Sequence, residues 1–433
     1  MNQAQFNAGL LAFLDQSPTP FHATENLTGA LHSAGFERLD ERAAWQLQSG
    51  GRYWITRNGS SMIAFSLGSA PLADAGFRMV GAHTDSPCLK LKPHPEIVAQ
   101  GYQQLGAEVY GGVLLNPWFD RDLSLAGRVT LALEDGTLCN RLVDFRAPLA
   151  IIPSLAIHLD REANDQRSIN KQTYLPALIR GKTPEPFELK TELVHFLVRS
   201  EPALASAKVQ AFELSFYDTQ PARLIGWHEE FIASARLDNL LSCYTGMCAL
   251  RDAESNVAQL LVCNDHEEVG SGSTSGARGN FLESVLQRLL GDHETQARAL
   301  AQSLLISTDN AHAVHPNFAD KHDAKHGPII NEGPVLKTNA NQAYATNSES
   351  AAVFRIAAEK AGVPVQAFVA RADLGCGSTI GPLAATRLGI RTVDVGVPTF
   401  AMHSIRELAG TLDAHALYLA LKVFLTLPRV TVD

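Results

Sequence analysis

The chain has 433 residues, which is too long for one ordinary hydrophobic core and predicts two or three domains. Apolar residues make up 45% of the chain and charged residues 19%, so the composition is that of a globular protein and excludes a disordered one. The net charge is −9 and no basic tract occurs, so we expect neither nucleic acid nor an anionic membrane as a partner.

The chain carries no recognisable export or membrane signal. Its first residues lack a basic segment, Asp15 interrupts the first apolar stretch, and no apolar run reaches the roughly 20 residues that span a bilayer. The six cysteines follow neither a zinc-ribbon nor a disulfide-framework spacing. We therefore expect a cytoplasmic protein with reduced thiols.

The first part of the chain predicts two helices, the second over Thr24–Ala34, and then strands at Tyr53–Thr56, Met62–Leu67 and Phe77–Val80. Regular alternation of strand and helix is missing between residues 87 and 232, where short strands predominate. The strands predicted there are Glu108–Val113, Gly127–Leu133, Leu193–Val198 and Gln210–Tyr217, with a hairpin turn at Glu134-Asp-Gly136. We interpret residues 87–232 as an inserted, β-rich domain.

Strands and helices alternate again after Ser234. The predicted strands are Gln259–Asn264, Leu304–Thr308, Val365–Ala370 and Thr392–Gly396, and the predicted helices are Leu240–Arg251, Phe281–Leu290, Gln296–Gln302, Ser350–Ala361, Ile380–Leu388 and Ala414–Leu425. This alternation predicts an α/β fold, with a mostly parallel or mixed sheet covered by helices. Residues 1–86 and 233–433 would form this domain.

Residues that bind metals recur just beyond the carboxyl ends of the predicted strands. In chain order they are His83 and Asp85, Glu267 and Glu268, Asp309, and His403. In open α/β sheets that edge is where ligands bind, so segments far apart in sequence are expected to converge there. Asp238 lies at the start of an apolar helix and, taken alone, would be assigned to helix capping.

Five of these residues provide two imidazoles and three carboxylates, which suit two divalent cations if one carboxylate bridges them. The predicted metal ligands are His83, Asp238, Glu268, Asp309 and His403. Nitrogen and oxygen ligands without cysteine favour zinc, with cobalt or manganese as substitutes.

Glu267 is adjacent to a predicted ligand but is not needed as one. A carboxylate beside a metal-bound water is suited to remove its proton and pass it to a leaving amine, so we expect Glu267 to be the general base. Asp85 follows His83 by two residues and is expected to hydrogen-bond the second nitrogen of its ring.

Other catalytic motifs are missing. The chain contains no HExxH and no GxSxG, and GSGSTSG at residues 270–276 does not match the dinucleotide-binding fingerprint. We interpret the histidines between His312 and His326 as part of a solvated loop near the site rather than as a third metal site.

Ten blocks, in order between residues 10 and 425, together resemble the aspartyl aminopeptidase family of dizinc peptidases. They read GAHTDSP, WFDRDLSLAGRV, LAIHLDR, ELSFYDTQPA, SARLDNL, NDHEEVGS, STDNAHAVHPN, GPVLKTNANQAYATN, CGSTIGP and MHSIRE. The resemblance implies a catalytic α/β domain interrupted by a β-rich domain that helps to form dimers. It also implies that the dimers assemble into a tetrahedral dodecamer.

The resemblance implies two zinc ions per subunit on the five ligands already named, with Asp238 as the bridge and Glu267 as the base. His83 and Asp309 would hold one ion, and Glu268 and His403 the other. It also implies substrate-binding residues, which are His158 from a neighbouring subunit, Lys337 in GPVLK, and Tyr344 in the same block.

The sequence thus predicts a metal-dependent aminopeptidase that removes amino-terminal residues from peptides, with Asp and Glu preferred by resemblance. Two alternatives stay open. One is a related dizinc amidohydrolase, either a carboxypeptidase or a deacylase, which would recognise a substrate carboxylate. The other is a catalytically inactive assembly protein on the same fold.

Overall fold

A computed structural model of the protein describes residues 1–431, which divide into two compact units. The first unit comprises Met1–Asp85, Ala222–Met402 and the chain from Glu407, and the second comprises Ser86–Pro221 and His403–Arg406. No helix among the described residues has both the length and the apolarity needed to cross a bilayer.

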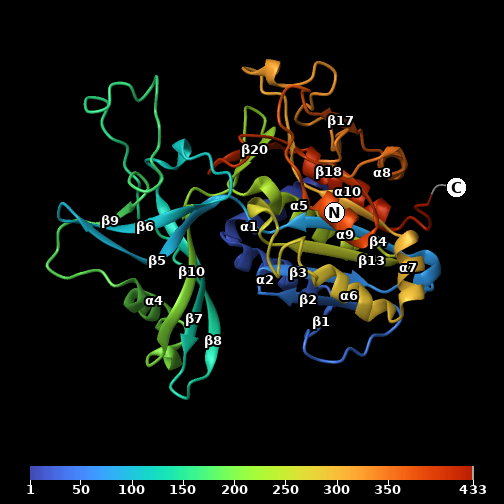
Figure 1. The fold of residues 1–433 in the computed structure, drawn as a ribbon, viewed down its shortest axis with the longest axis horizontal. Coiled ribbons are helices and arrows are strands. Elements are labelled where there is room, and N and C mark those ends of the chain that lie inside the picture. The colour runs from blue at the N-terminus through green and yellow to red at the C-terminus, as the bar shows by residue number, and fades with distance from the viewer. Residues whose placement is uncertain (432–433) are drawn as a thin grey trace. The chain divides into compact units, whose positions relative to one another are not determined.

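A mixed nine-stranded sheet forms the centre of the first unit (Figure 1). In spatial order its strands are β1 (Glu37–Arg38), β2 (Arg52–Arg57), β3 (Ser61–Ser66), β13 (Ala258–Asn264), β4 (Phe77–His83), β14 (Leu304–Thr308), β18 (Arg391–Gly396), β16 (Val335–Thr338) and β17 (Gln366–Val369). The central strands β13, β4, β14 and β18 are parallel. β13, β4 and β14 are buried along their whole length, which explains why most of their residues are apolar. The predicted α/β fold class is confirmed.

Alternate residues of the strands face two hydrophobic cores, one on each side of the sheet. In β3, Met62 and Ala64 belong to one core, and Ile63 and Phe65 belong to the other. The first core is covered by α1 (Gln3–Gln16), α2 (Pro20–Ser33), α5 (Leu237–Asp252), α8 (Ser348–Lys360) and α10 (Asp413–Leu425). The second is covered by α6 (Phe281–Leu290), α7 (His293–Ala301) and α9 (Ile380–Leu388). Short pieces complete this unit: α3 (Leu72–Ala75), η3 (Glu267–Val269) and η4 (Ala319–Lys321).

A second, five-stranded sheet also belongs to the first unit. Its spatial order is β11 (Arg223–Ile225), β12 (Phe231–Ser234), β20 (Glu407–Gly410), β19 (Pro398–Phe400) and β15 (Ala311–His312). Residues 222–232, which we expected in the inserted domain, lie in the first unit because β11 and β12 pair within this sheet.

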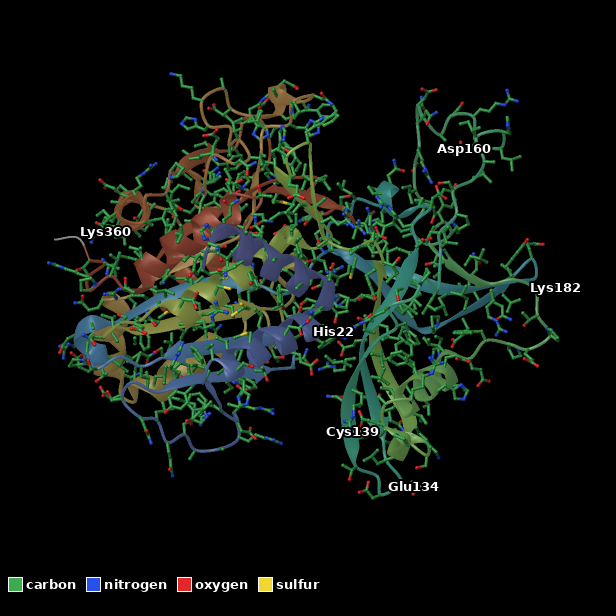
Figure 2. All side chains as sticks on the ribbon, turned by 180° about the vertical axis from the view of Figure 1, so that it is seen from behind. His22, Glu134, Cys139, Asp160, Lys182 and Lys360 are labelled. Atoms are coloured by element: carbon green, nitrogen blue, oxygen red, sulfur yellow. The ribbon has the colours of Figure 1, made fainter. Side chains whose placement is uncertain are left out.

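The second unit is built on a six-stranded antiparallel sheet with its own hydrophobic core. Its order is β8 (Leu138–Asp144), β7 (Leu123–Ala132), β10 (Lys208–Asp218), β5 (Cys88–Ala99), β6 (Tyr102–Tyr110) and β9 (Ala177–Arg180). The unit also contains α4 (Leu189–Val198), η1 (Asn116–Trp118) and η2 (Pro202–Leu204). The turn predicted around Glu134 joins β7 to β8, and Figure 2 labels Glu134 there.

The strand predicted over Leu193–Val198 is wrong, because these residues form the second half of α4. The buried residues of this helix are Leu189, Leu193 and Leu197, which recur at intervals of four and so line one helical face. The apolar run that ends the helix is too short to distinguish a strand from a buried helix by its pattern alone.

Arg78 in β4 is a buried cation that ties the end of the chain to the central sheet. Its guanidinium donates to the carbonyl oxygens of Leu427 at 2.8 Å, Pro428 at 2.8 Å and Ala75 at 3.0 Å. Burial lowers the pKa of Arg78 to about 10, so the group stays charged at neutral pH. The Arg78 guanidinium thus donates to three backbone carbonyls from a buried position.

Replacing Arg78 by Met should lower the free energy of unfolding by about 2–4 kcal/mol, because the carbonyls of Leu427 and Pro428 would lose their donors. Urea unfolding followed by circular dichroism measures this. Arg391→Met is the matched control, since the partly exposed Arg391 donates to the Ala301 carbonyl. Equal losses in the two variants would contradict this role of Arg78.

Candidate metal centre

Three neighbouring parallel strands, β13, β4 and β14, end at the same edge of the nine-stranded sheet. Asn264 at the end of β13 pairs with His83 at the end of β4, and β14 runs parallel to β4 on its other side. The acidic residues that follow β13 and β14 therefore lie at the same edge of the sheet as His83. The sequence predicts the metal-binding residues at this edge, because they follow the carboxyl ends of these strands.

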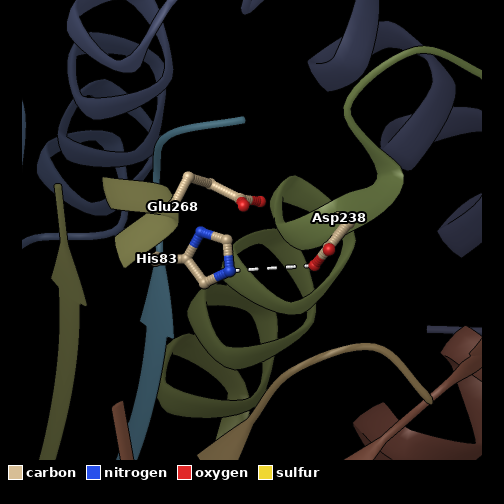
Figure 3. Close-up of side chains that lie close together, drawn as sticks. All are labelled: His83, Asp238 and Glu268. Carbon is tan, nitrogen blue, oxygen red and sulfur yellow. Dashed lines mark ion pairs between the residues drawn. The ribbon is translucent and has the colours of Figure 1, made fainter. Parts of the chain in front are cut away.

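His83, Asp238 and Glu268 form a compact group at this edge (Figure 3), and one ligand atom from each lies within 4.8 Å of the others. The Nε2 atom of His83 is 3.7 Å from Asp238 Oδ1, 3.7 Å from Asp309 Oδ1 and 4.0 Å from Glu267 Oε2. Zinc lies about 2.0–2.2 Å from such donors, which places the donors around one ion roughly 3–4 Å apart. The donor types and their spacing therefore fit zinc.

Asp85 orients both the imidazole and the paired glutamates. Its carbonyl oxygen is 3.0 Å from His83 Nδ1, and its carboxylate Oδ1 is 3.4 Å from the same nitrogen. The same carboxylate accepts the backbone N–H groups of Glu267 and Glu268 at 3.1 Å each. Because the Nδ1 atom of His83 faces Asp85, its Nε2 atom is the ring nitrogen that faces Asp238, Glu267 and Asp309.

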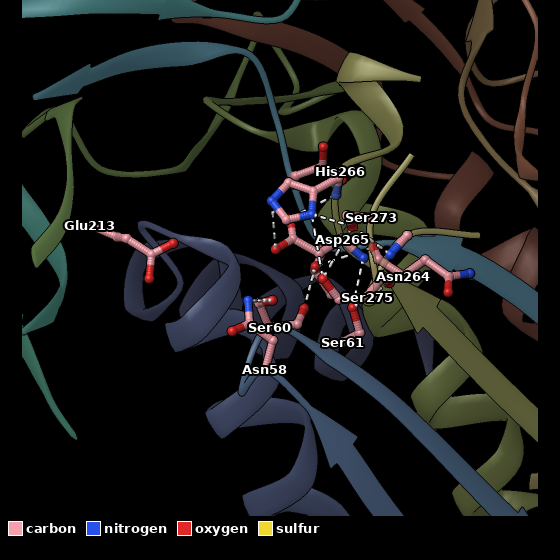
Figure 4. Close-up of polar contacts among 12 residues, drawn as sticks. Asn58, Ser60, Ser61, Glu213, Asn264, Asp265, His266, Ser273 and Ser275 are labelled. Atoms are coloured by element: carbon pink, nitrogen blue, oxygen red, sulfur yellow. Dashed lines mark hydrogen bonds and ion pairs between the residues drawn. The ribbon is translucent and has the colours of Figure 1, made fainter. Parts of the chain in front are cut away.

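The serine-rich tract after the paired glutamates holds the turn η3 in place (Figure 4). The Nδ1 atom of His266 is 2.8 Å from Ser273 Oγ. Ser61 Oγ accepts the N–H of Asp265 and donates to the carbonyl oxygen of Ser275, both at 2.8 Å. The small residues of SGSTSG thus serve as a hydrogen-bonded support beneath the turn.

Two buried contacts that the sequence does not reveal hold other parts of the site. Glu407 Oε2 accepts the backbone N–H of Asp238 at 2.8 Å. Asn239 Nδ2 donates to the carbonyl oxygen of Thr308, the last residue of β14, at 2.8 Å. The only signal for Glu407 and Asn239 was their place in the blocks MHSIRE and SARLDNL, where neither carried an assigned role.

Lys337 and Tyr344, the predicted substrate-binding residues of the first unit, are both buried beside Asp309. Lys337 Nζ is 3.6 Å from Asp309 Oδ2 and donates to the carbonyl oxygen of Asn310 at 3.0 Å. The ammonium also lies 5.0 Å from the centroid of the Tyr344 ring. The lysine charge therefore balances an acidic residue of the site itself.

Crowded carboxylates alter the protonation of the site. Burial, reinforced by nearby carboxylates, raises the pKa of Glu268 to about 10, and burial raises the pKa of Glu267 to about 7. Burial opposes a charge on His83, but the nearby carboxylates of Asp309 and Asp85 keep the pKa of His83 well above its usual value. Buried like charges are costly unless a cation neutralises them, which is what a bound metal would do here.

The two remaining predicted residues belong to the second unit. His403 has its Nδ1 atom 3.1 Å from the carbonyl oxygen of Gly112. His158 is exposed in the long loop between β8 and β9, where Figure 2 labels Asp160. The predicted roles of His403 and His158 beside the metal group stay predictions.

The histidines after Asp309 surround a separate cavity in the first unit. His312, His315 and His322 line an open cavity of about 340 Å³ together with Phe368 and Phe400. The group at the sheet edge is the one cluster of His, Cys, Asp and Glu in residues 1–431 whose ligand atoms are close enough to hold a metal.

The chain matches the family model described as Aminopeptidase I zinc metalloprotease (M18) over residues 13–425. The chain belongs to the M18 family of zinc aminopeptidases. It is 58% identical over 421 residues to a probable M18 family aminopeptidase 2 of Stutzerimonas stutzeri, covering 97% of this chain and 98% of the relative. A protein of the same description from Pseudomonas aeruginosa is 57% identical over 423 residues, covering 98% of each.

Solved structures show the same fold. A chain in the cryo-EM structure of the Ape4 and Nbr1 complex superposes with a TM-score of 0.94 at 39% identity, covering 98% of this chain and 86% of that chain. The crystal structure of prApe1 gives 0.91 at 29% identity, covering 98% and 94%. The S. cerevesiae mApe1 dodecamer gives 0.83 at 28% identity, covering 96% and 95%. This M18 member is therefore a zinc metalloaminopeptidase, a hydrolase, and the predicted family, enzyme class and metal are confirmed.

Zinc should bind this M18 protein more tightly as the pH rises. In the metal-free protein Glu268 and His83 hold protons at pH 7, because both pKa values are raised, and ligands must lose their protons to bind zinc. Each released proton makes the apparent affinity rise about tenfold per pH unit. Titration against a competing chelator between pH 6 and pH 8 measures this, and calorimetry in two buffers counts the protons. A change below about threefold over that range would contradict the assignment of Glu268 as a ligand.

Proposed function

We propose that this M18 aminopeptidase holds two zinc ions per subunit on His83, Asp238, Glu268, Asp309 and His403, with Asp238 bridging them. The observation that carries the proposal is the group formed by buried His83, buried Asp238 and partly buried Glu268, with an oxygen of Asp309 3.7 Å from the His83 Nε2 atom. Cobalt or manganese would substitute for zinc, because all the donors are nitrogen or oxygen.

Glu267 is the general base of this proposal. When bound, zinc would supply Lewis-acid chemistry, polarising the scissile carbonyl and acidifying water. The Glu267 carboxylate accepts the proton of the attacking water and returns it to the amine nitrogen as the C–N bond breaks. Its backbone N–H is held by Asp85, so the carboxylate is directed at the group while its neighbour Glu268 serves as a ligand.

The proposed substrates are peptides with a free amino-terminal residue, with Asp or Glu preferred. Lys337 and Tyr344 are the substrate-binding residues of this unit in the proposal, because a lysine is a point charge suited to a carboxylate or an oxyanion. Lys337 lies close to Asp309, so a substrate group that reaches it also reaches the metal group.

Glu267→Gln should lower kcat by about 10²–10⁴-fold while zinc content is unchanged, because the amide cannot accept the proton but keeps the shape of the side chain. Hydrolysis of a panel of aminoacyl p-nitroanilides, with zinc measured by atomic emission, tests this. N-acetylated versions of the same substrates should not be cleaved, whereas a carboxypeptidase or a deacylase would not need the free amine. Near-normal turnover by zinc-loaded Glu267→Gln would end the assignment.

The proposed active form is a homo-oligomer, a dodecamer built from dimers in which the second unit makes the dimer contacts. One structural neighbour is described as a dodecamer. The loop that carries His158 exposes Leu155, Ile157 and Leu159, which is unusual for aliphatic side chains and typical of surfaces that bind a partner. We place the enzyme in the cytoplasm, since the six cysteines, which all lie within residues 1–431, are free thiols.

Two variants of low activity should complement each other if His158 acts in the site of a neighbouring subunit. His158→Phe and Glu267→Gln should each be weakly active alone, and co-expression should restore part of the activity, because some sites then combine an intact Glu267 with an intact His158. Co-expression of His158→Phe with the double variant is the control, since it cannot form a complete site. Failure to recover activity in hybrids shown to contain both chains would contradict the shared site.

A further inference from the structure

Asp394 in β18 is a fully buried carboxylate that joins two loops of the first unit. Its Oδ1 atom accepts a hydrogen bond from Thr379 Oγ1 at 2.5 Å, and its Oδ2 atom accepts the backbone N–H of Ala345 at 2.6 Å. Its own backbone N–H donates to Thr346 Oγ1 at 2.9 Å. One side chain therefore fixes both the loop that enters α9, within the block CGSTIGP, and the loop that carries Tyr344.

Asp394 also lies directly across the sheet from Lys337. The two residues are partners in the antiparallel register of β16 and β18, where facing side chains lie close together, and their charges interact. The Lys337 ammonium in turn lies between Asp309 and the ring of Tyr344. A chain of contacts thus runs from Asp394 through Lys337 to the metal group.

The backbone around Asp394 is shaped to receive this carboxylate. A Cβ atom added at Gly381 would lie 2.4 Å from Asp394 Oδ1, so a larger residue there would displace the carboxylate. Thr379 meanwhile accepts the N–H of Gly381 at 3.2 Å and caps α9, which fixes the hydroxyl that donates to Asp394. Gly381 of the block CGSTIGP is therefore explained by the close approach of Asp394.

We propose that Asp394 is a positioning residue of the aminopeptidase reaction, which holds Lys337 and the Tyr344 loop in the geometry that binds substrate. This inference rests on the proposed roles of Lys337 and Tyr344. A carboxylate that served only as a helix cap would need no contact with Ala345 and no lysine opposite it. Asp394 makes both connections at once, and both lead to the side chains proposed to contact substrate.

Asp394→Asn should lower kcat/KM for aminoacyl p-nitroanilides at least tenfold, while zinc content and oligomeric state stay the same. Asp413→Asn is the matched control. Asp413 is equally buried and accepts the backbone N–H groups of Asn331 at 2.7 Å and Gly333 at 2.8 Å, but neither of these residues belongs to the site. The control should keep kcat/KM within twofold of wild type. A folded Asp394→Asn enzyme with wild-type kinetics, or equal losses in the two variants, would overturn the proposal.

A double-mutant cycle identifies the route by which Asp394 acts. If it acts through Lys337 and Tyr344, then adding Asp394→Asn to Lys337→Met or to Tyr344→Phe should cost much less activity than it costs in the wild type. Losses that multiply independently would contradict this route. Gly381→Ala should reproduce the kinetic effect of Asp394→Asn, since it displaces the same carboxylate.

Hydrogen exchange tests the inference without any reference to activity. In Asp394→Asn the backbone amides of residues 343–346 should exchange faster than in the wild type, and in Asp413→Asn they should not. Unchanged exchange in this loop would overturn the positioning role. A wild-type enzyme that fails to cleave any aminoacyl substrate would instead refute the proposed function, and exchange would still decide whether Asp394 fixes the loop.

Discussion

The common edge at which β13, β4 and β14 end brings buried carboxylates around a single imidazole, and this crowding of negative charge is the constraint behind the rest of the site. Burial disfavours each charge, and neighbouring acids disfavour it further, as the raised pKa values of Glu267 and Glu268 record. A divalent cation resolves the conflict, because it attracts every carboxylate at once. The repulsion within the metal-free group would therefore favour the binding of a divalent cation.

Side chains around the cluster hold its residues in place. Asp85 directs the imidazole and both glutamates, and Glu407 holds the backbone at Asp238. Lys337 supplies a positive charge beside Asp309, so it balances the site in addition to its proposed contact with substrate. The same lysine faces Asp394 across the sheet, so contacts run from Asp394 through Lys337 to Asp309.

The fold provides the rigidity that this arrangement needs. The central strands are covered on both faces by separate hydrophobic cores, so their carboxyl ends are held in register by packing as well as by hydrogen bonds. Functional groups lie on the short segments that follow these strands, and tracts such as SGSTSG brace those segments from below. The second unit has its own antiparallel sheet and core, and it presents the exposed loop of His158.

The central strands and most candidate site residues could be predicted from the sequence, because both depend on local patterns of apolar and polar residues. Strands buried on both faces are mostly apolar in sequence, and polar residues follow them at their carboxyl ends, where ligands bind in α/β sheets. His83, Glu267, Glu268 and Asp309 could therefore be selected without coordinates. The prediction of Asp238 as a metal ligand was less secure, because an acidic residue at the start of a helix commonly serves as its N-cap.

What the sequence left undecided depends on contacts between remote segments. Nothing local indicates that β4 lies between β13 and β14, which is what brings the ligands together. Glu407 and Asp394 look like ordinary acids in strands, and their partners lie 169 and 49 residues away along the chain. The second half of α4 was predicted as a strand because a short apolar run is compatible with either structure. Its tertiary surroundings decide which one forms.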